Sequence, residues 1–269
     1  MDPTDLRTCR SLLFLPASNA RAIEKARELP ADMIILDLED AVRPEEKAEA
    51  RRMAVAATQQ GFGDGRPVAI RVNATGTPPY GEDVTAVRQA KLDFIVLAKA
   101  ETGKDVHDAG WLMAKPVLAM IETPRAVIDA AAIAVPSGGL IAGVNDLSAT
   151  LGLPAQEERE GLVYALQRIV LAARAAGIPA FDGVYNRLEA DAGLEAECRQ
   201  GRAWGFDGKS VIHPSQIETA NRLFGPTAAE LDAARRLVAA ATGGAERHEG
   251  RMIEAMHVET AHRLIARAR

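Results

Sequence analysis

The sequence lacks several features that mark large classes of protein. Cysteine occurs only twice in 269 residues, at Cys9 and Cys198, which excludes a disulfide framework and leaves no metal-ligand spacing. No apolar run reaches the about 20 residues that a membrane-spanning helix needs, and the opening stretch "MDPTDLRTCR" lacks the apolar core of a secretory signal. We therefore expect a cytoplasmic protein with reduced thiols and no membrane partner.

An excess of positive charge is also absent. Lysine and arginine number 32 against 37 acidic residues, a formal net charge of −5, whereas nucleic-acid binding requires a clustered basic face. The sequence contains no Walker loop, no dinucleotide-binding fingerprint and no Ser/His/Asp arrangement, and "HEGRM" lacks the second histidine of the HExxH zinc motif. What remains is an alanine-rich, enzyme-like chain for which nucleic acid is not an expected partner.

Eight short apolar runs alternate with longer amphipathic segments. The runs lack strict polar alternation, which is typical of strands covered on both faces. Eight strands separated by helices predict an α/β fold, a (β/α)8 or TIM barrel, rather than an open doubly wound sheet. The expected strands are residues 11–17, 33–39, 67–73, 93–99, 116–122, 139–146, 178–184 and 207–213, and the clearest expected helices are 19–29, 45–60, 158–176 and 189–204.

A domain boundary is expected at "FGP", residues 224–226. Residues 1–225 are predicted to form the TIM-barrel catalytic domain, and residues 226–269 a C-terminal helical extension of two helices joined by the loop "GGAERHEG". The apolar stripes of these two helices must pack either on the barrel or on a neighbouring subunit. The extension therefore predicts self-association.

Polar side chains recur where the predicted strands end, which is where barrel enzymes build their active sites. Glu122 and Asp146 follow adjacent strands, and two carboxylates with waters and substrate oxygens suit Mg²⁺. Each could instead cap the helix that follows it. The polar residues at this rim are Asp37, Glu39, Asp40, Arg71, Asn73, Lys99, Glu101, Glu122, Asn145, Asp146, Asp182 and His213.

Three of the other rim residues have two interpretations each. Arg71 could be a structural arginine or, pointing into the barrel mouth, could clamp a carboxylate or a thioester carbonyl. Lys99 could form a Schiff base with a carbonyl substrate, or it could pair with Glu101 or an acid of the second strand. His213 could be a general base or a histidine hydrogen-bonded at a helix start.

Several stretches together resemble the citrate lyase β-subunit-like family, the CoA-ester lyases of the HpcH/HpaI aldolase group. The matching pieces are "LLFLPASN", "ILDLEDAV", "IRVN", "LAKAE", "IETP", "NDLSATLG" and "GFDGKSVIHPSQI", in order from about residue 10 to residue 217. The resemblance implies a TIM barrel, a divalent metal (Mg²⁺, with Mn²⁺ as a substitute), and a CoA thioester and a 2-oxo acid as small-molecule partners.

The resemblance also implies roles for individual residues. By motif match, Glu122 and Asp146 correspond to the two carboxylate metal ligands, and Arg71 corresponds to the arginine that contacts substrate oxygens. All three would therefore bind substrate as well. The backbone around residues 144–147 corresponds to the pocket for the carboxylate of a 2-oxo acid.

The acids of the second strand, with Lys99, are expected to support the primary ligands. Glu39 and Asp40 would hold metal-bound waters or orient Arg71 and Lys99. Asp37 lies two residues before Glu39, so both should share one face of the strand. In this interpretation Asp37, Glu39 and Asp40 support the metal ligands without binding the metal directly.

The C-terminal segment "GRMIEAMHVETA" resembles the extension of the malyl-CoA and citramalyl-CoA lyase branch. There the equivalent segment supplies an aspartate, often across a subunit boundary, and the resemblance suggests a homotrimer or homohexamer. Here the position holds Glu254, which is one methylene longer and is our candidate for the catalytic acid or base. The sequence also departs from many relatives at Asn19, where they have arginine, and at Ala126, where they have glycine.

The leading hypothesis is Mg²⁺-dependent carbon–carbon cleavage of a 3-hydroxyacyl-CoA into acetyl-CoA or propionyl-CoA and a 2-oxo acid. The alternatives in the same pocket are a malyl-CoA-type thioesterase and a citrate lyase β-like component that works with an acyl carrier. A metal-dependent aldolase acting on 2-oxo acids without CoA and a Schiff-base aldolase using Lys99 are further alternatives. A barrel that binds a CoA ester without turnover belongs to a different class of function.

Overall fold

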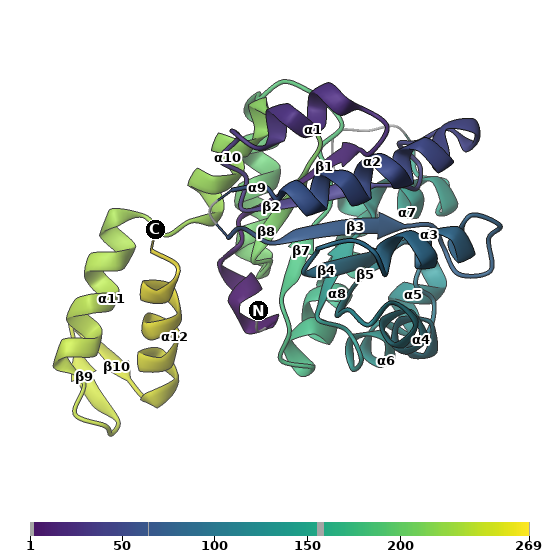
Figure 1. The fold of residues 1–269 in the computed structure, drawn as a ribbon. Helices are drawn as coiled ribbons and strands as arrows, with labels where there is room; N and C mark the ends of the chain where they lie inside the picture. Colours follow the sequence, from purple (N-terminus) through teal and green to yellow (C-terminus); the bar gives the residue numbers. More distant parts are fainter. Residues whose placement is uncertain (1–2, 64, 155–158, 269) are drawn as a thin grey trace.

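The computed structural model of the chain describes residues 3–63, 65–154 and 159–268. Eight parallel strands pair in sequence order, and β8 also pairs with β1, so the sheet closes into a barrel (Figure 1). This closure confirms the predicted TIM barrel and excludes the open sheet. The strands are β1 (Ser11–Pro16), β2 (Met33–Asp37), β3 (Val68–Val72), β4 (Phe94–Leu97), β5 (Val117–Ile121), β6 (Gly139–Ala142), β7 (Ala180–Asp182) and β8 (Gly208–Val211).

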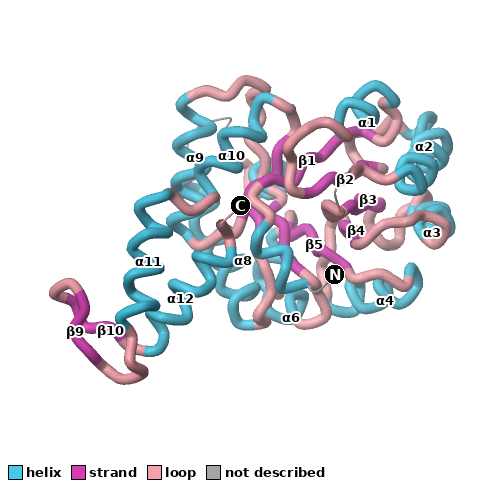
Figure 2. Tube along the Cα trace, turned by 60° about the vertical axis from the view of Figure 1, so that its left-hand side comes forward, coloured by secondary structure: helices cyan, strands magenta, loops and turns pink. Residues whose placement is uncertain are grey.

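Helices surround the barrel, and their boundaries follow from the local sequence (Figure 2). Asn19 caps α1 by accepting a hydrogen bond from the Ala22 N–H (3.0 Å), and Thr102 forms a capping box at the start of α4. The start of the expected helix 158–176 falls at residue 158, outside the described residues. The helices are α1 (Ala20–Ala26), α2 (Lys47–Gln60), α3 (Tyr80–Val87), α4 (Gly103–Met113), α5 (Pro124–Ile128), α6 (Ala130–Ala134), α7 (Val144–Thr150), α8 (Val163–Ala175), α9 (Ala192–Trp204) and α10 (Ser215–Phe224), with 3₁₀ turns at Pro3–Thr8, Pro44–Glu46 and Glu160–Leu162.

Apolar side chains form two layers, one inside the barrel and one between the strands and the helices. In β2, Met33 and Ile35 belong to the inner layer and Ile34 and Leu36 to the outer one, which is the alternation of an extended strand. Each fully buried leucine or isoleucine contributes about 1.5–3 kcal/mol. The same alternation brings Asp37, the next residue of the inner set, to the mouth of the barrel.

All eight strands are shorter than the sequence predicted, and the difference is largest for β6 and β7. The expected strand 139–146 ends at Ala142, and α7 begins at Val144. Asn145 and Asp146 therefore lie in the first turn of a helix and not at a strand end. The expected strand 178–184 is confined to β7, Ala180–Asp182.

The C-terminal extension consists of α11 (Ala228–Ala240), a hairpin of β9 (Glu246–His248) and β10 (Arg251–Ile253), and α12 (Ala255–Ala266). The two predicted helices are present, but the prediction of a plain loop between them is wrong. Glu249 and Gly250 both have positive φ, 47° and 81°, which is the backbone of the tight turn that joins two hairpin strands. The "EG" dipeptide therefore makes a hairpin.

The extension joins the barrel at the end opposite to the mouth. Arg267, after α12, donates through Nη2 to the carbonyl oxygens of Asp207 (2.6 Å) and Phe224 (3.0 Å), and Asp207 lies just before β8. Arg202 and Glu230 add an ion pair between α9 and α11 (2.8 Å). Beyond these contacts α11 and α12 project away from the barrel side by side (Figure 1). No helix among the described residues is long and apolar enough to cross a membrane.

Candidate active site

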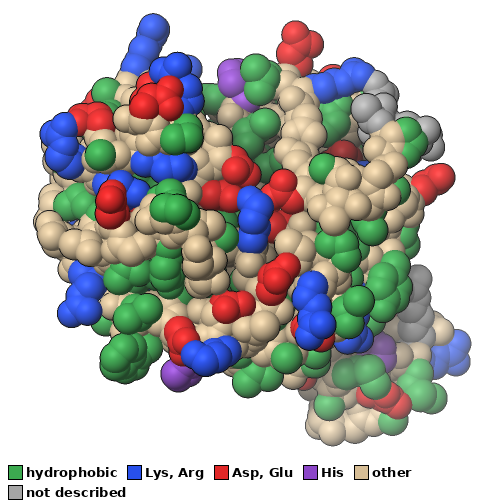
Figure 3. All heavy atoms as spheres, turned by 90° about the vertical axis from the view of Figure 1, so that its right-hand side faces the viewer, with side chains coloured by type: hydrophobic (Ala, Val, Ile, Leu, Met, Phe, Trp, Pro, Cys, Tyr) green, Lys and Arg blue, Asp and Glu red, His purple; other side chains and the backbone are tan. Residues whose placement is uncertain are grey.

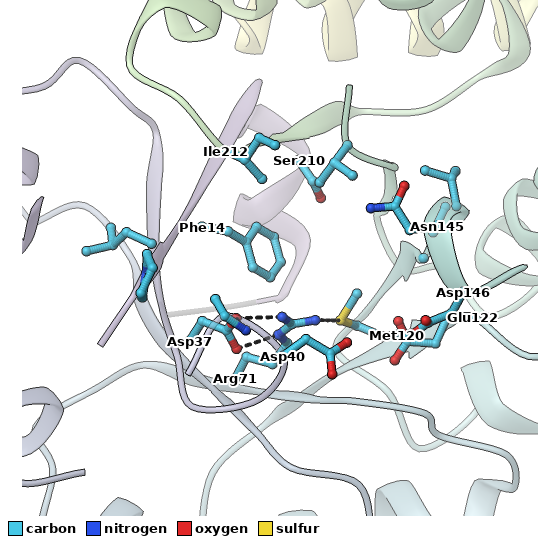
Figure 4. A pocket seen from close by; sticks show the side chains of 17 residues that line it. Phe14, Asp37, Asp40, Arg71, Met120, Glu122, Asn145, Asp146, Ser210 and Ile212 are labelled. Carbon is cyan, nitrogen blue, oxygen red and sulfur yellow. Dashed lines mark hydrogen bonds and ion pairs between the residues drawn. The ribbon is translucent and has the colours of Figure 1, made fainter. Parts of the chain in front are cut away.

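A cavity of about 350 Å³ opens at the carboxyl ends of the strands. Acidic and basic side chains gather at the centre of this face (Figure 3), and the cavity beneath is lined by side chains from several strands (Figure 4). Of the residues that the sequence predicted for the site, those that line the cavity are Asp37, Asp40, Arg71, Glu122, Asn145 and Asp146. Glu39 and Lys99 contact this group through ion pairs.

Arg71 is held in one orientation by Asp37. Its Nε and Nη2 donate to the two carboxylate oxygens of Asp37 at 2.7 and 2.6 Å, a bidentate pair. The guanidinium also lies over the ring of Phe14, 5.5 Å from the centroid, and Nη1 lies 3.6 Å from the Met120 sulfur. Burial lowers the pKa of Arg71, but the charge and hydrogen bonds of Asp37 together with the charges of Glu39 and Glu122 raise it more, so the pKa lies above its ordinary value. Arg71 is therefore a fixed positive charge at the cavity wall.

The acids of the "DLED" stretch stabilise the turn in which they lie. Asp37 accepts hydrogen bonds from the backbone N–H groups of Glu39 (2.8 Å) and Ala41 (3.1 Å) while it holds Arg71. Glu39 Oε2 also lies 2.9 Å from Arg71 Nη1, but the two atoms are not aligned for a hydrogen bond, and Oε2 has no hydrogen-bond partner among the described residues. Asp37 and Glu39 thus both contact Arg71, although β2 ends at Asp37 and Glu39 lies in the turn that follows.

Lys99 connects the second-strand acids with the two predicted metal ligands. Its backbone has a φ of 49°, a strained value for a residue with a side chain, and its N–H donates to Glu122 Oε1 (2.6 Å). Its Nζ donates to Glu39 and lies 3.4 Å from Asp146 and 3.6 Å from Asp40. Burial lowers the pKa of Lys99, but the bond to Glu39 and the neighbouring carboxylates raise it above its ordinary value. A Schiff-base lysine needs the neutral amine, so this environment argues against that interpretation.

Glu122 is almost completely buried, with 2% of the residue exposed. Burial, and then the charge of Glu39, raise its pKa to about 7. Its place depends on Gly143, because a Cβ there would overlap Cβ and Oε2 of Glu122. The glycine of "AGVND" therefore lets the chain pass directly over the carboxylate, and it ends β6 at the same point.

The site carries more negative than positive charge. When all are ionised, the five carboxylates of Asp37, Glu39, Asp40, Glu122 and Asp146 face the two cations Arg71 and Lys99, which leaves a net charge of −3. Burial and the charge of Glu39 together raise the pKa of Glu122, and Oε2 of Glu39 has no hydrogen-bond partner among the described residues. These residues fit a divalent cation. No three His, Cys, Asp or Glu side chains in the described part of the chain converge closely enough to hold a metal alone, so water and substrate would complete the shell, as Mg²⁺ prefers.

Glu254 does not line the cavity of its own chain. It is the N-cap residue of α12, and its N–H donates to His257 Nδ1 (3.0 Å). The other end of α12 is anchored through Arg267 to the side of the barrel opposite to the mouth, and α12 spans about 18 Å. A role for Glu254 therefore requires the cavity of a second copy. His213 Nδ1 lies 2.9 Å from Ser215 Oγ, which agrees with the helix-start interpretation.

Sequence reasoning did not find the apolar wall of the cavity or its buried hydroxyl. Phe14, Met120, Ile212 and Ser210 line it. The signal that identifies them is the alternation of side chains along each strand, because these residues continue the set that points into the barrel. A ranking of rim residues by chemical type favours acids and overlooks serine and methionine.

Comparison with known proteins identifies the family. The model of the HpcH/HpaI aldolase/citrate lyase family matches residues 10–214. The chain belongs to this family. It is 40% identical over 269 residues to a (3S)-malyl-CoA thioesterase of Cereibacter sphaeroides (strain KD131 / KCTC 12085), covering 96% of this chain and 94% of that protein. It is 35% identical over 283 residues to the citrate lyase subunit beta of Escherichia coli (strain K12), covering 97% and 94%.

A solved relative has the same architecture. The crystal structure of protein CitE from Mycobacterium tuberculosis, in complex with magnesium, acetoacetate and coenzyme A, matches with a TM-score of 0.82 and 33% identity, covering 97% of this chain and 99% of that one. The resemblance inferred from the sequence motifs is thereby confirmed. The chain is an enzyme of the citrate lyase β type, in a group that contains CoA-ester lyases and thioesterases.

Proposed function

We propose that the chain catalyses Mg²⁺-dependent carbon–carbon cleavage of a 3-hydroxyacyl-CoA of the malyl-CoA or citramalyl-CoA type. The products would be acetyl-CoA or propionyl-CoA and a 2-oxo acid. The observation that carries the proposal is the meeting of Glu122, Asp146 and the fixed Arg71 around one cavity with an excess of negative charge. The relative that holds magnesium, acetoacetate and coenzyme A supports this choice of ligands.

Glu122 and Asp146 would hold the cation. When bound, Mg²⁺, or Mn²⁺ in its place, would supply Lewis-acid stabilisation of negative charge on the oxygens of the 2-oxo acid. Asp146 is the more accessible of the two carboxylates, with 36% of its side chain exposed against the buried Glu122. Asp40, Glu39 and Lys99 would orient waters and the neighbouring charges.

Arg71 would stabilise the thioester part of the substrate. Cleavage breaks the C2–C3 bond after a base takes the proton of the 3-hydroxyl group, and the electron pair moves onto the thioester as an enolate that is then protonated at C2. Arg71 is bound bidentately by Asp37, so its charge is already in place when the enolate oxygen develops. Glu254 of a second copy is our proposed acid or base, and we propose a homotrimer or homohexamer as the assembly.

The test is a mass-spectrometric screen of 3-hydroxyacyl-CoA esters with purified protein and Mg²⁺. We expect acetyl-CoA or propionyl-CoA together with a 2-oxo acid, and Glu122→Gln should abolish both. The matched control is Glu101→Gln, which changes an exposed glutamate at the same rim. Absence of cleavage of every ester at high enzyme concentration would overturn the proposal.

Thioester hydrolysis in the same pocket is the second candidate. The 40% identity to (3S)-malyl-CoA thioesterases favours it. The same screen separates the two reactions, because hydrolysis releases free CoA and a hydroxy acid without acetyl-CoA or propionyl-CoA. A citrate lyase β-like role would instead show cleavage only when the ester is carried by an acyl carrier protein.

A further inference from the structure

Ser210 is a buried hydroxyl without a partner. The residue is 1% exposed, and its Oγ has no hydrogen-bond partner among the described residues. The other buried serines of the described chain are bonded: Ser11 Oγ donates to Asn221 Oδ1 and Ser137 Oγ donates to the Ile133 carbonyl oxygen, both at 2.7 Å. Leaving a buried hydroxyl unpaired costs free energy, and most proteins avoid it. The exception therefore calls for a ligand.

The Ser210 hydroxyl faces the cavity. Ser210 lies on β8 and pairs in register with Leu12, an inner-layer residue of β1. Its neighbour Val211 belongs to the outer layer, and strand alternation places Ser210 on the inner face. Ser210 lines the cavity, where Figure 4 shows it beside Ile212 and across Phe14 from Arg71.

The surroundings of Ser210 select the chemistry of the group that it would bind. Phe14 and Ile212 make this part of the wall apolar. Among the described lining residues Arg71 is the only basic one, and it is occupied by Asp37 on the other side of Phe14. A carboxylate next to Ser210 would therefore be desolvated without a counter-charge, which is costly. A neutral oxygen needs only the one hydrogen bond that the serine supplies.

We propose that Ser210 is a specificity-determining residue that hydrogen-bonds a hydroxyl group on the bound 2-oxo acid, at the end remote from its carboxylate. The ester that is cleaved would then be of the citramalyl-CoA type with a hydroxyl group on its methyl substituent. This inference rests on the proposed function, since it places the 2-oxo acid between the metal ligands and β8. A pocket that offers a buried hydrogen-bonding group discriminates against the analogue that lacks the matching group, because its own polar atom then stays unpaired.

The test uses two ligands of nearly equal size, 3-hydroxypyruvate and 2-oxobutyrate, which differ by a hydroxyl in place of a methyl group. Their dissociation constants are measured by calorimetry with Mg²⁺ present. We expect the unaltered protein to prefer 3-hydroxypyruvate by about tenfold. Ser210→Ala should bring the ratio close to one, mainly by weakening 3-hydroxypyruvate, and Ser210→Thr, which keeps the hydroxyl, should retain the preference.

Ser137→Ala is the matched control, because it removes a buried serine hydroxyl that is already bonded inside the protein. It should leave the ligand ratio unchanged and lower the melting temperature, whereas Ser210→Ala should not lower it. A ratio that survives in Ser210→Ala, or equal binding of the two acids by the unaltered protein, overturns the role of Ser210 alone. If neither acid binds in the presence of Mg²⁺, the proposed function fails and this inference fails with it.

Discussion

The charge of Glu122 should destabilise the fold when no cation neutralises it. Burial and the charge of Glu39 raise its pKa to about 7 from an ordinary value of 4.5. When the pKa of an acid is higher in the folded state than in the unfolded state, the free energy of unfolding falls as the pH rises between the two values. The penalty is therefore absent below about pH 4.5 and fully present above about pH 7.

Glu122→Gln removes this charge and keeps both the shape and an acceptor for the Lys99 N–H. One pKa unit corresponds to about 1.4 kcal/mol, so a pKa difference of about 2.5 corresponds to a change of about 3 kcal/mol in the free energy of unfolding. With an unfolding entropy of about 2.1 cal/mol/K per residue, this raises the melting temperature of the 269-residue chain by about 5 °C. The gain should appear at pH 8 with a chelator present and should vanish near pH 4.5.

The assay is thermal unfolding of both proteins at pH 4.5 and pH 8, with chelator and then with Mg²⁺. Mg²⁺ should stabilise the unaltered protein and leave Glu122→Gln unaffected, so the variant would be more stable and inactive. Glu101→Gln, at an exposed position, should change neither quantity. If Glu122→Gln lowers the melting temperature equally at both pH values, the buried charge is already compensated and our reasoning from burial is wrong.

Four further predictions concern the same site and the extension. Gly143→Ala would overlap the Glu122 side chain and should abolish stabilisation by Mg²⁺ in thermal unfolding; an unchanged response would contradict the close approach. Because a proton competes for Glu122 with a pKa of about 7, Mg²⁺ affinity measured by calorimetry should fall about tenfold from pH 8 to pH 6, and a flat profile would assign the metal elsewhere. Glu39→Gln should weaken Mg²⁺ affinity only modestly where Glu122→Gln abolishes it, and equal losses would mean that these carboxylates are ranked wrongly. Arg267→Ala removes the bonds to the carbonyls of Asp207 and Phe224, so it should lower stability by about 2 kcal/mol and expose the extension to proteases without altering Mg²⁺ affinity, which limited proteolysis would check.

The barrel could be predicted because its main determinant is local. A strand covered on both faces needs apolar residues at every position, and "MIIL" before Asp37 shows this directly. The helices between the strands have their own caps, such as Thr102. Repetition of the pattern eight times then leaves few architectures that bury every strand.

The end of β6 could not be predicted, because a tertiary contact sets it. The apolar stretch continues through Val144, and nothing local marks Ala142 as the last residue of the strand. The glycine is needed because the backbone crosses Glu122 from the neighbouring strand. The same contact turns Asp146 from a strand-end residue into a residue of the first turn of α7.

Lys209 and Ser210 show why residue type alone misleads in a barrel strand. Lysine attracts attention as a catalytic group, yet Lys209 is completely buried and pairs with Asp182 and Glu197 at 3.3 and 2.8 Å, behind the barrel wall. Serine draws less attention as a catalytic group, but the register of β8 against β1 places Ser210 at the cavity. Adjacent residues of a strand point to opposite faces, so one has a structural role and its neighbour can line the site. Only the register of the strand decides which of the two points into the barrel. Of these two neighbours, the one that lines the cavity is Ser210, whose hydroxyl has no hydrogen-bond partner among the described residues, and not the fully paired Lys209.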